Sequence, residues 1–352
     1  LVVVLPFGGV IADRVGAARV IATTDIVVSL VVAIEAALFL TGTVTIPVLA
    51  VLAAIVGGLA GLWYPAYPAL VPDVVRHEDH LQTANAYVSV ASNGGLIAGN
   101  AIGGLLVAWL GAGPAIAVDA VTFLAAGLLV LSFRRVSKAR HSGMSMFGDL
   151  AHGWRLVTSI RWFVVVVLAF SVIVMALRGA EEVMGPVLAL DHYGGAAGWA
   201  VVLAAMSIGL LVGAFTASRI HVQRPMLFGM LITLVLPVWL VTLALALPLA
   251  VVALGAFAWG MAIELFQVIW YTTLQTHIPR ESLSRVSSYD AMGSLMFGPI
   301  GLALAGPLIA WVGLEAAFLV AAAVALAAIV GSLLFASVRA LRSDDPVATL
   351  PG

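Results

Sequence analysis

Ten long apolar segments fill most of this 352-residue chain and restrict its fold more than any other feature. A helix needs roughly 20 apolar residues to cross about 30 Å of hydrocarbon. By that measure, after a partial span over residues 1–11, we expect membrane spans near residues 20–41, 46–70, 82–110, 114–133, 161–190, 196–218, 225–246, 249–273, 283–310 and 314–338. The alternating polar pattern of a lipid-exposed sheet is missing, so we predict an all-α integral membrane protein.

The composition supports this class and excludes others. Charged residues make up 9% of the chain, whereas a soluble domain carries about 25%. A net charge of −1 argues against a nucleic-acid partner. Without cysteine there is no disulfide, thiol nucleophile or thiolate metal site. No P-loop, Gly-x-Ser-x-Gly or His-Glu-x-x-His motif is present, so we expect neither an enzyme nor an ATP-driven pump, and no cofactor or metal.

The basic residues predict the topology. All 16 lysines and arginines except Arg178 fall in alternate loops or in the tail. The intervening loops hold none, and they lie at residues 41–45, 111–113, 191–195, 247–248 and 311–315. Cytoplasmic loops carry the excess of basic residues. We therefore place residues 134–160 and the tail, 339–352, on the cytoplasmic side of the cell membrane.

An internal repeat divides the chain into two parallel halves. A shift of 202 residues aligns Leu81 with Leu283 and Gly99 with Gly301, and it places a second Ala-Trp-x-Gly sequence on the first. We expect two bundles, at residues 1–133 and 161–338. Because the second half starts near residue 161, the first half should start about 40 residues before the first residue of this sequence. One helix and the start of another are then missing, and the intact protein would have two six-helix bundles.

The segment between the halves, residues 134–160, is basic at its start and amphipathic at its end. We expect a loop followed by a short helix on the cytoplasmic face, with anionic lipid as the partner of the basic residues.

A glycine-rich charged motif follows the first apolar run. Gly9, Asp13, Arg14, Gly16 and Arg19 form the pattern Gly-x-x-x-Asp-Arg-x-Gly-x-x-Arg, which we interpret as a short charged turn. Glycine permits a tight turn and close helix approach, and the acid suits a helix N-terminus. The motif resembles the loop between the second and third helices of major facilitator superfamily transporters. That resemblance implies two bundles rocking about a central cavity, with this motif as the cytoplasmic gate.

A second motif lies in the segment 82–110. Gly95, Gly99, Gly103 and Gly104 match the pattern Gly-x-x-x-Gly-Pro-x-x-Gly-Gly, with Asn100 in place of the proline. This is similar to the fifth-helix motif of drug exporters in the same superfamily, where it is associated with antiport by sealing the cavity. The alternative is ordinary tight helix packing. Residues 72–76, 84–85 and 119–123 also look like the drug and siderophore exporter branch.

Charges inside the spans are expensive and are therefore candidates for function. Arg178, Glu181 and Glu182 share one helix face, so the arginine can neutralise one acid and leave the other free to bind a proton. The alternative is a structural ion pair near the outer membrane edge. For Asp119, close to the outer surface, we favour a structural role.

Glu264 lies near mid-span without an arginine within helical reach, so it is either protonated at rest or faces a water-filled cavity. The same argument applies to Glu35. Asp25 lies closer to the cytoplasmic end, where we favour simple interfacial solvation over a role in coupling. Trp259 and Phe266 flank Glu264 and are candidates for contacting substrate.

We therefore predict a monomeric secondary transporter that exports amphiphilic small molecules, drugs or siderophore-like compounds, by proton-coupled alternating access. The first alternative is proton-coupled nutrient uptake, which the Asn100 substitution keeps open. The second is a membrane receptor or assembly partner without flux.

The topology is directly testable, because the natural chain lacks cysteine. Single cysteines at positions 14 and 134 should react with a membrane-impermeant thiol reagent from the same side of the membrane, the cytoplasmic one. Labelling from opposite sides would overturn the assignment.

Overall fold

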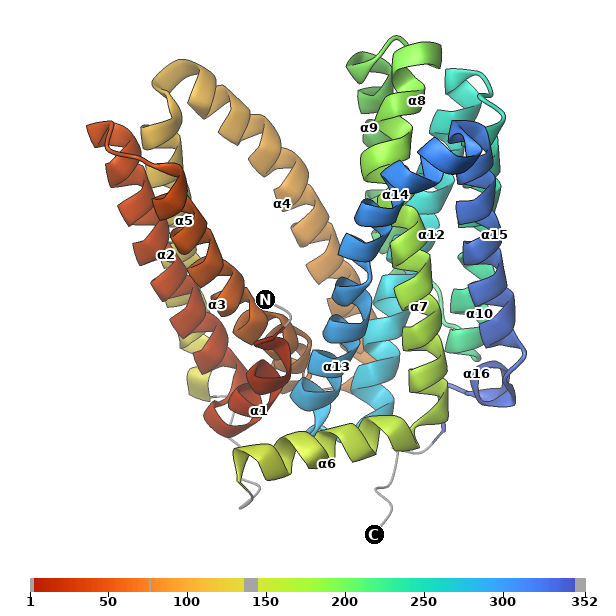
Figure 1. Ribbon diagram of the computed structural model, residues 1–352. Coiled ribbons are helices and arrows are strands. Elements are labelled where there is room, and N and C mark those ends of the chain that lie inside the picture. Colours follow the sequence, from red (N-terminus) through yellow and green to blue (C-terminus); the bar gives the residue numbers. More distant parts are fainter. Residues whose placement is uncertain (1–2, 76, 136–144, 346–352) are drawn as a thin grey trace. The chain divides into compact units, whose positions relative to one another are not determined.

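The computed structural model describes residues 3–75, 77–135 and 145–345, and within these ranges every regular element is a helix (Figure 1). Ten helical stretches are long and apolar enough to cross a membrane, which confirms the all-α membrane prediction. They are Ala17–Thr41, Ile46–Val74, Leu81–Leu110, Ala112–Arg135, Arg161–His192, Ala196–Ala217, Pro225–Ala244, Leu249–His277, Leu283–Val312 and Leu314–Leu333. Arg76, the residues 136–144 with Lys138 and Arg140, and the tail residues 346–352 lie outside the described ranges.

Packing divides the chain into two units, and the division does not follow chain order. Unit 1 comprises residues 1–78, 95–157 and 278–292, and unit 2 comprises 79–94, 158–277 and 293–352. A segment of the first half, residues 79–94, therefore packs in unit 2. A segment of the second half, residues 278–292, packs in unit 1. Whether residues 1–133 and 161–338 form separate bundles remains a prediction.

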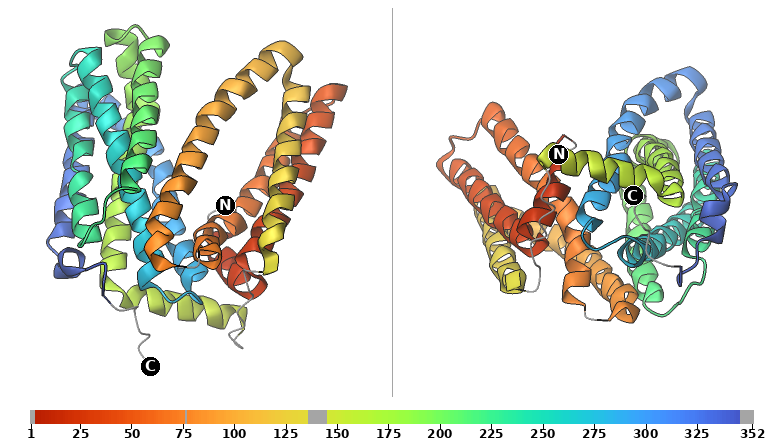
Figure 2. Two further views of the ribbon diagram at one scale, coloured as in Figure 1. Left: turned by 180° about the vertical axis from the view of Figure 1, so that it is seen from behind. Right: turned by 90° about the horizontal axis from the view of Figure 1, so that it is seen from below.

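Unit 1 is built from the helices of the first half and the start of one helix of the second. Its elements are α1 (Leu5–Val15), α2 (Ala17–Thr41), α3 (Ile46–Val74), α5 (Ala112–Leu131), η2 (Ser132–Arg135), most of α6 (Met146–Ser159), the end of α4 (Leu81–Leu110) and most of α13 (Leu283–Met296). Figure 2 shows α2 beside α5 and α3. The helix expected in the linker is present as α6.

Unit 2 contains most of the second half. Its elements are α7 (Arg161–Gly179), the π-helical turn η3 (Ala180–Met184), α8 (Gly185–His192), α9 (Ala196–Ala217), α10 (Pro225–Ile232), α11 (Val235–Ala244), α12 (Leu249–His277), α14 (Gly298–Val312), α15 (Leu314–Leu333) and α16 (Ala336–Ala340). The start of α4 completes it.

Helix ends follow from glycine and proline. The α2 helix stops at Gly42, whose φ of +67° lets its N–H reach the carbonyls of Leu38 and Phe39. The next span, α3, starts with proline in its first turn, where the missing N–H has no helical partner to lose.

Close backbone contact between α9 and α12 forms the centre of unit 2. A Cβ on Gly209 would lie 2.1 Å from the Phe257 carbonyl oxygen, and one on Gly213 would lie 2.4 Å from that of Met261. From the other helix, a Cβ on Gly260 would lie 2.2 Å from the Met206 carbonyl oxygen. Small residues let membrane helices approach until their backbones touch. These glycines therefore make α9 and α12 a rigid pair.

A stack of aromatic rings packs against this pair. Phe266 of α12 lies parallel to Phe170 of α7, with ring centroids 4.5 Å apart, and Trp270 stacks on Phe163 at 5.6 Å. Large aromatic side chains contribute much of the packing in such a core.

We predict that Gly213→Ala destabilises the protein by about 1–3 kcal/mol, because the new methyl group must displace the α12 backbone. Gly306→Ala is the matched control, since a Cβ at that position of α14 meets no atom within 4 Å. Melting temperatures in detergent micelles should fall for Gly213→Ala alone. Equal melting curves for the two variants would contradict the packing described.

Candidate functional site

The charged motif of residues 9–19 lies at the junction of α1 and α2. The expected charged turn is wrong in its extent: the turn is a single residue, Gly16, with a φ of +98°. Asp13 and Arg14 belong to the last helical turn of α1, and Arg19 belongs to α2. Glycine adopts this φ without the steric penalty that a side chain would bring, so the chain reverses within one residue.

Gly8 and Gly9 allow α1 to approach two other helices. A Cβ on Gly8 would lie 2.2 Å from the carbonyl oxygen of Gly61 in α3. A Cβ on Gly9 would lie 2.6 Å from the carbonyl oxygen of Ser284 in α13. The first glycine of the motif is thus needed for contact with a helix of the second half of the chain.

The same contact brings Asp13 to an arginine. Arg285, in the first turn of α13, donates from Nε to Oδ2 of Asp13 at 2.7 Å. Both side chains are almost completely buried, with exposed fractions of 7% and 5%. The positive end of the α13 dipole adds to the attraction for the carboxylate.

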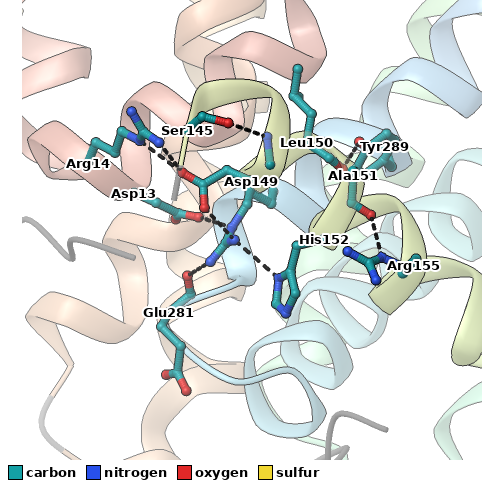
Figure 3. A network of polar contacts seen from close by, with 12 residues as sticks. Asp13, Arg14, Ser145, Asp149, Leu150, Ala151, His152, Arg155, Glu281 and Tyr289 are labelled. Carbon is teal, nitrogen blue, oxygen red and sulfur yellow. Dashed lines mark hydrogen bonds and ion pairs between the residues drawn. The ribbon is translucent and has the colours of Figure 1, made fainter. Parts of the chain in front are cut away.

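Asp149 of α6 joins this pair to Arg14, as Figure 3 shows. Arg14 donates to Asp149 Oδ2 from Nε at 2.9 Å and from Nη2 at 2.5 Å. The other carboxylate oxygen, Oδ1, lies 3.4 Å from Nη1 of Arg285. We call Asp13, Arg14, Asp149 and Arg285 the charge cluster. Two acids and two arginines alternate in it, so it carries no net formal charge.

Neighbouring polar groups complete the site. Nη2 of Arg285 donates to the backbone carbonyl of Glu281 at 2.7 Å, and Nη1 lies 3.4 Å from Nδ1 of His152. The Tyr289 hydroxyl donates to the Leu150 carbonyl at 2.9 Å. Ser145 caps α6 by accepting the Gly148 N–H (Figure 3). Helix α6 is therefore held at its N-terminus and along one face.

Sequence inspection found only half of the charge cluster. Arg285 resembled any other basic loop residue, and Asp149 lay in a segment that we expected to face lipid. The sequence of α6 nevertheless contains a signal that Asp149 is buried. This acid lies on the same helix face as the small Gly153 and the apolar Leu156, and all three residues are buried. Arg19 is exposed, and among the described residues its side chain donates only to the Val15 carbonyl, at 3.4 Å, so it lies outside the cluster.

Residues 79–94, the segment of the first half that packs in unit 2, make polar contacts there. Asn85 of α4 donates to Oε1 of Gln275 in α12 at 2.7 Å, and the Gln275 amide donates back at 3.3 Å. Gln82 donates to the carbonyl of Ala217, the last residue of α9, and to that of Ile220 just beyond it. In each unit, hydrogen bonds hold the start of a helix that belongs by sequence to the other half of the chain. We call the starts of α4 and α13 the borrowed helix starts.

The acids at the end of α7 lie where a π-helical turn interrupts the regular helix. Arg178 forms an ion pair with Glu182, and both side chains are largely exposed. Glu181 is partly buried and makes no hydrogen bond or ion pair with any residue that the structure describes. One acid is thus neutralised and the other is not.

Glu264 is 8% exposed and packs against Gly213 at the crossing of α9 and α12. Within the described ranges its carboxyl group has neither a hydrogen bond nor an ion pair. Trp259 and Phe266 are each 1% exposed and belong to the core of unit 2. Contact between these two rings and a substrate would require the core to open.

In unit 1 the intramembrane acids differ in burial. Asp25 is buried where α2 crosses α5, and a Cβ on Gly127 would lie 3.2 Å from its own Cβ. The expectation of interfacial solvation for Asp25 is therefore wrong, because the close approach of α5 covers it. Glu35 is half-buried on α2, and Asp119 is exposed on α5.

The glycine motif of α4 has open space beside it within unit 1. A Cβ on Gly95, Gly99, Gly103 or Gly104 would meet no atom of the described residues within 4 Å. Sealing of the cavity and tight helix packing both stay predictions for this motif. The Asn100 side chain lies outside the described part of the structure.

Among the residues that the structure describes, no three His, Asp or Glu side chains are placed to hold one ion.

Ten candidate membrane-spanning helices in the described residues and a helical linker define a polytopic membrane protein. The sequence profile of the Major Facilitator Superfamily matches residues 1–295, and the chain belongs to that family.

Two relatives and one solved structure show what the chain resembles. It is 30% identical over 344 residues to the "Multidrug efflux pump Tap" of Mycolicibacterium fortuitum, covering 91% of this chain and 80% of the relative. It is 26% identical over 264 residues to the "Enterobactin exporter EntS" of Citrobacter koseri, covering 70% and 60%. The fold matches a "bacterial homologue of iron transporter ferroportin in outward-facing state", with a TM-score of 0.72, 14% identity, and 95% and 86% coverage.

We predict that Asp149→Ala lowers the free energy of unfolding by about 3–5 kcal/mol, because it leaves the buried Arg285 and the partly buried Arg14 facing a single acid. The measurement is a thermal unfolding curve in micelles. Asp344→Ala is the control: Asp344 accepts from Arg342 Nε at 3.1 Å at the exposed C-terminal end. This hydrogen bond lowers the pKa of Asp344, but exposed pairs contribute little to stability. Unchanged unfolding of Asp149→Ala would show that the charge cluster does not hold α6 in place.

Proposed function

We propose that this transporter exports amphiphilic small molecules, drug-like or siderophore-like, by proton-coupled alternating access. The charge cluster is the observation that carries the proposal. It ties α1 of the first half to α13 of the second half through the linker helix α6. A transporter that alternates between two states needs contacts between its halves that are strong when formed and reversible when broken.

Polar contacts suit this reversible role. The Asn85–Gln275 amide pair and the charge cluster both involve helix starts borrowed from the other half. Their groups can be hydrated when they separate, which makes opening less costly than exposing an apolar contact to water. The two borrowed segments would return to their own halves when the gate opens.

The proposed coupling group is Glu264. It is a buried carboxyl without a partner among the described residues, and it sits on the rigid α9–α12 pair. A buried acid is neutral unless a charge or water stabilises its ionised form. Glu264 is therefore the group that we propose to exchange the coupled proton during the transport cycle. Glu181, beside the Arg178–Glu182 pair, is the second candidate, and Glu35 the third.

The proposed direction of transport rests on the names of the relatives, and the proposed cytoplasmic side rests on the distribution of arginines among the loops. The names of both curated relatives describe export. The distribution of arginines favours a cytoplasmic location for α6, for the charge cluster and for the C-terminal tail in the cell membrane. The proposed working unit is a monomer, with protons and lipids as its other partners.

We predict that cells expressing the protein retain less of a fluorescent cationic dye than control cells, and that an uncoupler abolishes the difference. Glu264→Gln should remove the uncoupler-sensitive part of the efflux, because an amide cannot carry a proton. Glu315→Gln, at an exposed acid in the first turn of α15, is the matched control and should leave efflux unchanged.

The competing functions give different results in the same assay. A symporter for uptake would raise the dye content of expressing cells. A receptor without flux would leave it unchanged, and neither Glu264→Gln nor the control would alter it. Either result contradicts export.

A further inference from the structure

Unit 2 contains a groove that has no role in the proposed transport cycle. It has a volume of about 510 Å³ and lies between α7, η3, α14 and α15. Ala176, Met184 and Ala305 are buried and form its floor, whereas Leu304 and Val320 are about half exposed and form its rim. The groove therefore opens to the surroundings of the bundle along the line between α14 and α15.

Local backbone features create this space. A Cβ on Gly301 would lie 2.0 Å from the Met175 carbonyl oxygen, so α14 touches α7 at that level. Beyond the contact the π-helical turn η3 widens α7, and Pro307 interrupts the hydrogen bonds of α14. Gly313, with a φ of +86°, then connects α14 directly to α15. The two helices diverge on either side of the floor.

The chemistry of the walls selects the ligand. All the residues that line the groove are apolar, and none offers a side-chain hydrogen bond to a polar group except the indole of Trp311 at one end. Sites for drug-like molecules contain a few polar groups that fix their orientation. The body of this groove contains none and suits a hydrocarbon chain.

The length of the groove matches one membrane leaflet. Along α14 its lining runs from Gly301 to Trp311, which is about 15 Å at 1.5 Å per residue. Half of a hydrocarbon core about 30 Å thick is the same distance. Trp311 is 84% exposed and lies next to the end of α14, at the level where tryptophan anchors a helix among lipid headgroups.

We propose that this groove binds one acyl chain of a membrane phospholipid, in the leaflet on the side of the Gly313 turn. The chain lies between α14 and α15 with its end near Gly301, and the headgroup lies beside Trp311. The bound acyl chain covers the apolar rim residues Leu304 and Val320, which the protein itself leaves about half exposed. This inference depends on the membrane location of the bundle and not on the direction of transport or on the substrate.

The test uses the purified protein in vesicles of phosphatidylethanolamine and phosphatidylglycerol. A small share of the phosphatidylglycerol carries a diazirine group on one acyl chain, and the cross-linked peptides are mapped after illumination. In the natural protein the label should concentrate on the peptides containing residues 301–311 and 320–324. Val320→Trp fills the rim and should lower this labelling about tenfold, the effect of losing burial of roughly two methylene groups.

Leu319→Trp is the matched control, because Leu319 neighbours Val320, is similarly exposed and does not line the groove. It should leave the labelling unchanged. Leu304→Trp, on the opposite wall, should lower labelling as Val320→Trp does, and circular dichroism verifies the fold of each variant. Equal labelling in all four proteins would overturn the proposal. Displacement of the label by an excess of a transported dye would also overturn it, and would assign the groove to substrate.

Discussion

A lipid bilayer supplies no hydrogen-bond partners, so charged groups buried near its edge must neutralise one another within the protein. The charge cluster satisfies this constraint with two acids and two arginines from three helices. Removing any one member would leave a buried charge without compensation. The positions of α1, α6 and α13 relative to one another in unit 1 therefore depend on this cluster, and so does the site to which we assign the gate.

The two kinds of helix contact in this protein serve different purposes. Between α9 and α12, glycines bring backbones together, and close packing of the two backbones makes the contact. At the borrowed helix starts, amides and ion pairs make the contact, and water can replace each partner. The first kind maintains a unit through a conformational cycle, and the second kind can be broken and formed again.

The prediction for Asp25 failed because its solvation depends on which helix approaches from elsewhere in the chain. Asp25 is covered because Gly127 of α5 admits close contact. Spacing along one helix shows that close contact is permitted, but it does not identify a neighbour. Asp149 was missed for the same reason, since its two arginines lie more than one hundred residues away in sequence.

The candidate spans and their lengths are local properties of this chain. They follow from the cost of placing polar groups in hydrocarbon, which each segment meets by itself. Even the charged motif of residues 9–19 was recognisable, because Asp13 and the single-residue turn at Gly16 are only three positions apart. The pairing of Asp13 with Arg285 spans 272 residues. A contact over that separation becomes favourable only when packing of the intervening helices has already brought the two side chains together, so it is decided by the folded structure.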